Sequence, residues 1–101
     1  MKNQDQLELN LKEETNLEEP KKFKVFLLND DYSTMDFVID VLRTIFRKSS
    51  QQSEIIMLNI HNNGRDLCGI YTNEIASTKI AQVKSLARQN GFPLKAIMEE
   101  E

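Results

Sequence analysis

The chain has 101 residues, of which 40% are hydrophobic and 29% are charged, and its net charge is -3 at pH 7. This length allows one small domain, and the composition is that of a globular protein rather than a disordered or fibrous one. No apolar run approaches the roughly 20 residues that a membrane-spanning helix needs, so we predict no association with a membrane.

Residues 1–20 are predicted to form a flexible N-terminal arm. The first 19 residues carry six acidic and two basic side chains and contain no glycine, proline or aromatic residue. Such a composition buries too little apolar surface to order itself. One piece is patterned: Leu7-Glu8-Leu9-Asn10-Leu11 alternates, as a short strand or a docking motif would. The arm lacks the features of a secretory signal, and the single cysteine, Cys68, cannot form an internal disulfide, so we expect a reducing, cytoplasmic location.

The folded domain is predicted over residues 21–101 and begins with a strand followed by a helix. Phe23–Leu28 is rich in aromatic and branched side chains, which is typical of a short buried strand. After an acidic turn, Ser33 or Thr34 can accept the free N–H groups of a helix start, which predicts a helix over Met35–Arg47. Its inner face consists of Val38, Val41, Leu42 and Ile45.

A second helix is predicted over Gln51–His61, close enough to pair with the first as a hairpin. Its apolar residues Ile55, Met57 and Leu58 are less clearly on one side than those of the first helix. The helix is expected to end near Gly64, since glycine tolerates the positive φ that often closes a helix.

Two strands and one helix complete the predicted domain. Leu67–Tyr71 reads as a strand in which Gly69 indicates a bulge or a close backbone approach. A third helix follows a cap at Thr72 or Asn73 and ends at Gly91, and Pro93–Met98 supplies the last strand. The buried stripe of this helix is Ala76, Ile80, Val83 and Ala87.

The element order is therefore β-α-α-β-α-β. An order of this kind predicts an α+β fold, a two-layer sandwich in which three helices cover one face of a three-stranded antiparallel sheet.

The sequence gives little support for catalysis or for a cofactor. A metal site would have to be built from Asp30, Asp31 and Asp36, which lack the spacing of a calcium-binding loop. A catalytic thiol would need Cys68 activated by His61, but a cysteine in the middle of a strand ordinarily packs as a small hydrophobe. Glycine-rich phosphate loops are absent, and the basic residues form no cluster with aromatic ones, so we predict no catalytic residue, no metal, no cofactor and no nucleic-acid binding.

Adjacent aspartates at a strand end leave a signalling function open as a competing hypothesis. A phospho-accepting receiver domain begins its magnesium site with such a pair, but it requires a doubly wound parallel sheet with more elements than this chain has. A scaffold that binds a protein partner through its helices is a third hypothesis.

Two sets of side chains suggest one composite site. Taken singly, each residue has a structural explanation as a turn, a helix-end charge or part of the core. The polar set is Asn29, Asp30, Asp31 and His61, and the apolar set is Met35, Val38, Met57 and Leu94. Together they suit a ligand in which an ammonium group lies beside a bulky hydrophobic group, because an ammonium offers only donors and therefore needs acceptors. A free protein N-terminus is such a ligand.

A longer series of residues carries a family resemblance. In chain order it comprises Lys24-Val25, Asn29–Tyr32, Met35–Leu42, Met57-Leu58, His61, Gly64, Cys68-Gly69, Thr72, Glu74, Ala76, Thr78-Lys79, Ala87-Arg88 and Pro93-Leu94. In these residues, which span nearly all of 22–98, the chain resembles the ClpS family of Clp-protease adaptors. The resemblance implies a monomeric, non-enzymatic protein of the bacterial cytoplasm. It implies binding of N-end-rule substrates, whose first residue is Leu, Phe, Tyr or Trp, and their delivery to the ClpA-type AAA+ unfoldase of the ClpAP protease, whose substrate choice it modulates.

The resemblance also assigns roles to residues. It implies that Asn29, Asp31 and His61 hold the α-ammonium group directly or through water, with His61 unprotonated. Asp30 and the Ser33 region would then fix the first peptide unit. The implied side-chain pocket consists of Met35, Val38, Met57 and Leu94, with Met35 acting against β-branched first residues.

Two further features follow from the same resemblance. Glu74 and Lys79 are implied to dock on the N-terminal domain of the unfoldase, and the N-terminal arm matches the family's delivery arm in character. The chain departs from the common family pattern at Ser33, often Thr, and at Thr34, often Pro. Loss of the proline is expected to loosen the loop before Met35 and so to affect selectivity among first residues.

Overall fold

The computed structural model describes residues 19–101, so the arm predicted over residues 1–20 lies almost wholly outside the described residues. Six elements follow one another: β1 (Lys22–Leu28), α2 (Met35–Thr44), α3 (Ser50–Asn63), β2 (Arg65–Thr72), α4 (Asn73–Asn90) and β3 (Lys95–Glu100). The predicted α+β fold and its β-α-α-β-α-β order are confirmed.

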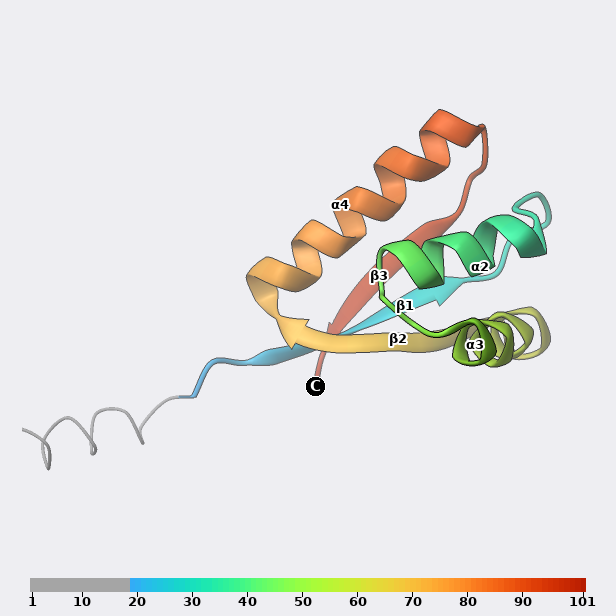
Figure 1. Cartoon of the computed structure of the whole chain (residues 1–101). Coiled ribbons are helices and arrows are strands. Elements are labelled where there is room, and N and C mark those ends of the chain that lie inside the picture. The colour runs from blue at the N-terminus through green and yellow to red at the C-terminus, as the bar shows by residue number, and fades with distance from the viewer. Residues whose placement is uncertain (1–18) are drawn as a thin grey trace, which may run out of the picture.

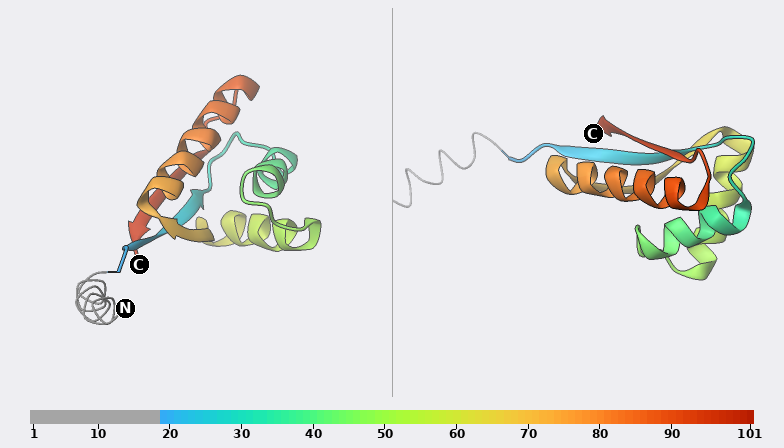
Figure 2. Two further views of the ribbon diagram at one scale, coloured as in Figure 1. Left: turned by 60° about the vertical axis from the view of Figure 1, so that its left-hand side comes forward. Right: turned by 90° about the horizontal axis from the view of Figure 1, so that it is seen from above.

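The sheet has the order β2-β1-β3, and both pairs of neighbouring strands are antiparallel (Figure 1). All three helices lie on the same face of the sheet, as the view from above shows (Figure 2). The central strand β1 supplies the middle of the core, where Val25 and Leu27 are fully buried. Its C-terminal end opens into the turn that leads to α2, so the acidic turn lies at one edge of the helical layer.

Strand β2 carries the irregularity predicted at Gly69. Its register with β1 shifts so that Val25 pairs with Gly69 and Phe26 with Leu67, which leaves Cys68 as the extra residue of a bulge. A side chain at Gly69 would collide with the ring of Tyr71. Both readings of this glycine, a bulge and a close approach, therefore apply at the same position.

Helix α2 begins as predicted and ends earlier. The Thr34 hydroxyl accepts a hydrogen bond from the Phe37 N–H at 3.1 Å. The helix ends at Thr44 and not at Arg47, because Arg47 adopts a left-handed φ of 57° and the Lys48 N–H turns back to the Leu42 carbonyl at 3.0 Å. No glycine or proline marks this end, so the apolar pattern predicted a helix three residues too long.

Helix α3 buries a different face from the one predicted. Ile55 and Leu58 are exposed by 58% and 48%, whereas Ser53, Met57 and Ile60 are buried at spacings of four and three residues. A Ser49–Gln52 capping box starts the helix, which runs to Asn63 and closes at Gly64 with a φ of 93°. The prediction directed Ile55, Met57 and Leu58 toward the core. It missed that Ile60 and the small side chain of Ser53 lie on the same buried face as Met57.

The second half of the domain follows the prediction closely. In α4, Ala76, Val83 and Ala87 are buried and Ile80 packs partly buried against the core. The Thr72 side chain makes no capping hydrogen bond. Strand β3 begins at Lys95 rather than at Pro93. Proline has no N–H to donate to a sheet, so the chain enters the sheet after it.

Candidate functional site

The turn after β1 is held by the carboxylate of Asp30. One of its oxygens, Oδ1, accepts the Tyr32 N–H at 2.8 Å and the Ser33 N–H at 2.6 Å, and Oδ2 accepts the Ser33 hydroxyl at 2.7 Å. All three bonds are local, so the acidic sequence itself folds this turn. Asp30 is thereby used inside the protein, and its neighbour Asp31 is exposed and forms no hydrogen bond or ion pair with the described residues.

The ionisation of Asp30 reflects these contacts. Burial would raise the pKa of this carboxyl, but the hydrogen bonds from Ser33 and Tyr32 favour the charged form and outweigh it, so that its pKa lies below the usual value. Asp30 is therefore a carboxylate at neutral pH, and its charge is already engaged by donors of the turn.

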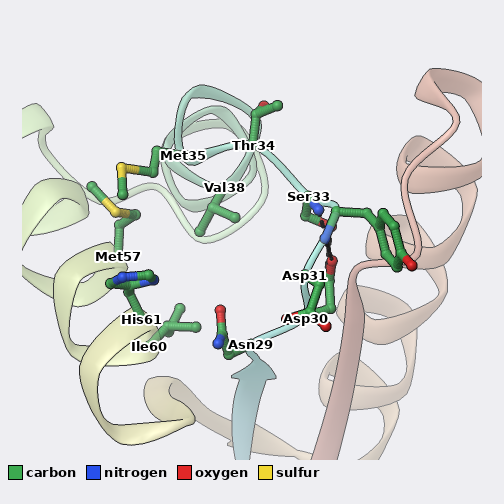
Figure 3. Close-up of a pocket in the computed structure, with 11 residues that line it drawn as sticks. Asn29, Asp30, Asp31, Ser33, Thr34, Met35, Val38, Met57, Ile60 and His61 are labelled. Atoms are coloured by element: carbon green, nitrogen blue, oxygen red, sulfur yellow. Dashed lines mark hydrogen bonds between the residues drawn. The ribbon is translucent and has the colours of Figure 1, made fainter.

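A backbone hydrogen bond brings the end of β1 to the end of α3. The Asn29 N–H donates to the Gly64 carbonyl at 2.8 Å, just beyond the last turn of α3, which carries His61. Figure 3 shows Asn29 and His61 on the same side of one cavity, with the Asn29 side chain directed into it. Two polar side chains that lie 32 positions apart in the sequence therefore border one site.

The apolar wall comes from the two helices that flank this turn. Val38 of α2 and Met57 and Ile60 of α3 are buried, and Figure 3 shows Met35 above Met57 at the edge of the cavity. Met35, the first residue of α2, is 50% exposed. Methionine has three rotatable bonds and a polarizable sulfur, so these two side chains can adjust to ligands of different shape.

Together these elements enclose a pocket of about 540 Å³ (Figure 3). It is lined by Asn29, Asp30, Asp31, Tyr32, Ser33, Thr34, Met35, Val38, Met57, Ile60 and His61. The acceptors of the turn and His61 form a polar wall, and apolar side chains of α2 and α3 form an apolar wall. The two walls meet on α3, where His61 lies beside Met57 (Figure 3). The volume is of the size that small-molecule and cofactor sites have.

The structure brings together all the residues predicted for this pocket except Leu94. That residue is buried and lines a second hollow, between the end of α4 and the start of β3. Its place in the apolar set of the lining is taken by Ile60, which the sequence prediction missed. Ile60 lies three residues after Met57 on the buried face of α3, so the helical period from Met57 would have found it.

Tyr32 and Thr34 also line the pocket and were not predicted. Both lie between residues that were predicted, in the four-residue stretch from Asp31 to Thr34. Tyr32 is among the most exposed large hydrophobic side chains of the described chain. A single exposed aromatic side chain is ordinary on a protein surface, so this exposure assigns no role to Tyr32.

The two residues predicted to dock on a partner lie on α4, away from the pocket. Glu74 is exposed in the first turn of that helix. Lys79 is half-buried, and its ammonium group donates to the Ile45 carbonyl at 2.7 Å, at the C-terminal end of α2. It also lies 5.6 Å from the centre of the Tyr71 ring. A cation at the C-terminal end of α2 interacts favourably with the negative end of the helix dipole. Lys79 of α4 therefore connects α4 to α2.

Cys68 is buried away from the pocket and is not an activated nucleophile. Cys68 is 1% exposed, and burial raises the pKa of its thiol to about 12, so it is a thiol at neutral pH. Within residues 19–101 no three His, Cys, Asp or Glu side chains gather in a way that would hold a metal ion. In the same residues no helix is long and apolar enough to cross a membrane.

Comparison with known proteins places this geometry in context. Residues 18–97 match the family described as ATP-dependent Clp protease adaptor protein ClpS. The chain is 55% identical over 93 residues to the ATP-dependent Clp protease adapter protein ClpS of Wolinella succinogenes, covering 92% of this chain and 91% of that protein. It is 52% identical over 100 residues to the protein of the same name from Syntrophus aciditrophicus, covering 99% and 92% of the two chains.

A solved structure is similar as well. It is that of Agrobacterium tumefaciens ClpS2 bound to L-phenylalaninamide, with a TM-score of 0.79 and 37% sequence identity. The match covers 82% of this chain and all of that one.

Proposed function

The chain belongs to the ClpS family of Clp-protease adaptors, which are not catalytic, and from this premise we propose that it recognises proteins by a free N-terminal residue with a bulky hydrophobic side chain. The observation that carries the proposal is that acceptors and apolar side chains line one pocket as two adjoining walls. Leu, Phe, Tyr and Trp are the first residues that this combination suits.

The polar wall is proposed to bind the α-ammonium group. Asn29, Asp31 and His61 all line the pocket, and neither the Asp31 carboxylate nor the His61 ring makes a hydrogen bond with the described residues. An ammonium group has three N–H donors, and an amide oxygen, a carboxylate and a neutral imidazole nitrogen can each accept a hydrogen bond from one of them. The L-phenylalaninamide bound by the Agrobacterium relative has a free α-amino group and an amide in place of the carboxylate, as the first residue of a peptide has.

Asp30 and Ser33 take a supporting part in this proposal. The Asp30 carboxylate is occupied by three hydrogen bonds from the turn, so its role is to hold Asp31 and Ser33 in place. We therefore revise the expectation that Asp30 itself contacts the first peptide unit and make it a positioning residue. The exposed residues of the turn, Asp31 and Tyr32, are left to face the peptide.

The apolar wall is proposed to bind the first side chain. An aromatic side chain buries about 200 Å², which corresponds to roughly 5 kcal/mol before the costs of ordering. Val38, Met57 and Ile60 are buried and form the floor, and Met35 is exposed at the mouth. A side chain branched at Cβ would carry its bulk at the mouth, beside Met35, where an unbranched Cβ passes more easily.

Peptides that differ only in the first residue test this function. Peptides beginning with Phe and Leu should bind, as measured by fluorescence anisotropy, and one beginning with Val should bind more weakly. Acetyl-Phe should fail to bind, because acetylation removes the charge and two of the three donors, so the acceptors of the site would lose their partners in the complex.

The acetylated peptide gives the decisive comparison, since it keeps the phenylalanine side chain. Equal affinity for Phe and acetyl-Phe peptides would refute recognition of the ammonium group. Equal affinity for Phe and Val peptides would refute the role of Met35 while leaving the rest of the site unaffected.

Delivery to a partner is the second half of the proposed function. We propose that Glu74, at the exposed start of α4, and Lys79 contact the N-terminal domain of a ClpA-type AAA+ unfoldase. The protein is proposed to bind the unfoldase as a monomer. Lys79 already bonds to Ile45, so its substitution would disturb the fold as well as the contact. Glu74 is the better residue to test.

Reversing the charge of Glu74 should weaken binding to that domain. Glu74→Lys is expected to lower the affinity for the purified N-terminal domain by up to several-fold, because an exposed ion pair contributes less than about 1 kcal/mol. Affinity for a Phe peptide should stay unchanged, which isothermal titration of both ligands would check. Loss of both affinities would instead mean that the variant is misfolded.

A further inference from the structure

The second hollow of the domain has the character of a binding groove. It has a volume of about 360 Å³ and lies between the C-terminal half of α4 and the start of β3, along their upper ends in Figure 1. Its lining is Ile80, Lys84, Ala87, Arg88, Phe92, Pro93, Leu94, Lys95 and Ala96. We call this hollow the α4–β3 groove. It is separate from the peptide pocket, and no residue lines both.

The rim of the α4–β3 groove is positively charged. Lys84 and Arg88 are four residues apart and so lie on one face of α4, and Lys95 comes from β3 on the other side. All three side chains belong to exposed residues, and none of them forms a salt bridge within residues 19–101. No acidic side chain lines the groove. Its chemistry therefore fits an apolar segment that carries carboxylates.

The chain itself contains a segment of that chemistry. Leu7-Glu8-Leu9-Asn10-Leu11 alternates apolar and polar residues, and carboxylates flank it at Asp5, Glu13 and Glu14. In an extended conformation its leucines point to one side. They match the apolar floor of the groove, and the carboxylates match the rim. The first 19 residues, which contain this segment, carry six acidic and two basic side chains, so the charge of the arm is opposite to that of the rim.

The arm also has a suitable length. Lys22 pairs with Thr72, which immediately precedes α4, so the arm joins the domain at the N-terminal end of that helix. The groove residues from Ile80 to Arg88 lie roughly 10–23 Å further along the helix, at 1.5 Å per residue. Twelve residues separate Leu9 from Lys22. A flexible chain of that length has a root-mean-square span of about 18–22 Å. Because the two distances agree, the effective concentration of the leucine segment at the groove is close to its maximum.

From these observations we infer that the α4–β3 groove binds the chain's own segment Leu7–Leu11, with its leucines on the apolar floor and the neighbouring carboxylates against Lys84, Arg88 and Lys95. This contact does not depend on the proposed function of the peptide pocket. An arm bound in this groove would leave the peptide pocket unobstructed, because the two sites share no lining residue.

Paramagnetic relaxation in the full chain tests the contact. An Asn10→Cys variant can be labelled with a nitroxide at one site, because the native Cys68 is buried. Amide signals of Arg88, Phe92 and Lys95 should lose most of their intensity, several-fold more than those of α3. A mixture of labelled chains with unlabelled, isotope-enriched chains should show no such loss, since the contact is within one molecule.

Two matched variants of the labelled chain separate a specific contact from general attraction. Lys84→Glu/Arg88→Glu should abolish the selective loss, and Arg43→Glu/Arg47→Glu, with the same change of charge at the end of α2 and in the loop after it, should preserve it. Replacing the three leucines of the segment by serine leaves the groove untouched and should also abolish the loss. Uniform weak broadening, an equal effect of the two charge-reversed pairs, or a loss that survives the serine substitutions would each overturn the inference. Broadening in the mixed sample would overturn it too, in favour of contact between copies.

Discussion

Replacing Asp31 by alanine should lower the affinity for a peptide beginning with Phe by roughly 10- to 150-fold, which corresponds to a loss of about 1.5–3 kcal/mol for a hydrogen bond to a charged group. Asp31 lines the pocket, is exposed, and has no hydrogen-bond or ion-pair partner among the described residues. Its charge is therefore available to an ammonium group. Fluorescence anisotropy with the same labelled peptide gives the ratio of affinities directly.

The stability of this variant provides the control. Because Asp31 makes no such bond in residues 19–101, Asp31→Ala should change the free energy of unfolding by no more than about 0.5 kcal/mol. Unaltered peptide affinity would remove Asp31 from the site. A large fall in stability would show that the residue holds the turn, as its neighbour does.

Replacing Asp30 by alanine should differ from the Asp31 variant in its effect on stability. The substitution removes the acceptor of three hydrogen bonds, from two N–H groups and one hydroxyl, and should lower the free energy of unfolding by on the order of 1–3 kcal/mol. Urea denaturation of the two alanine variants side by side measures the difference. Peptide affinity should also fall, because the turn that presents Asp31 loses its support.

The loss of stability in Asp30→Ala should depend on pH. The pKa of Asp30 is lowered in the folded state, so its contribution is fully present above the pKa that the residue has when unfolded. It is lost as the pH falls through the lower, folded value. The difference between the parent chain and Asp30→Ala should therefore be constant near neutral pH and shrink in acid. A difference that grew in acid would mean that the carboxyl is stabilised in its protonated form.

The pair Asp30 and Asp31 illustrates how far sequence reasoning reaches into the site. Two adjacent carboxylates in a turn look equivalent in the sequence, and both were assigned to the ligand. The structure distinguishes Asp30, whose oxygens accept hydrogen bonds from the turn, from Asp31, which is exposed to solvent. Side-chain direction in a turn follows from the backbone dihedral angles of each residue, and two identical neighbouring residue types do not reveal which of them turns inward.

Most of the fold was predictable because its signals are local. Ser49 with Gln52 at the start of α3, and Gly64 and Gly91 at the ends of α3 and α4, mark helix boundaries directly in the sequence. The end of α2 was not predictable in this way, since Arg47 takes a left-handed conformation without being glycine. Tertiary contacts, including the bond from Lys79 to Ile45, favour that end over continued helix.

The difference between the predicted and the observed lining of the pocket has another cause. Leu94 and Ile60 are both buried apolar residues, and the sequence cannot say on which side of the core each one lies. The prediction placed Leu94 in the pocket, whereas the structure puts it in the wall of the α4–β3 groove and Ile60 in the pocket wall. Hydrophobic patterns identify which side chains avoid water and leave open which neighbours they meet.

Half of the Met35 side chain is in solvent, whereas Ile60, at the bottom of the same pocket, belongs to the core. This difference has an evolutionary consequence. A substitution at the mouth changes which ligands enter at little cost to folding, but a substitution at the floor leaves a cavity or overfills the core and destabilises the whole domain. Selection can therefore retune the ligand preference of such an adaptor through Met35 while the requirement for a stable fold keeps the floor constant.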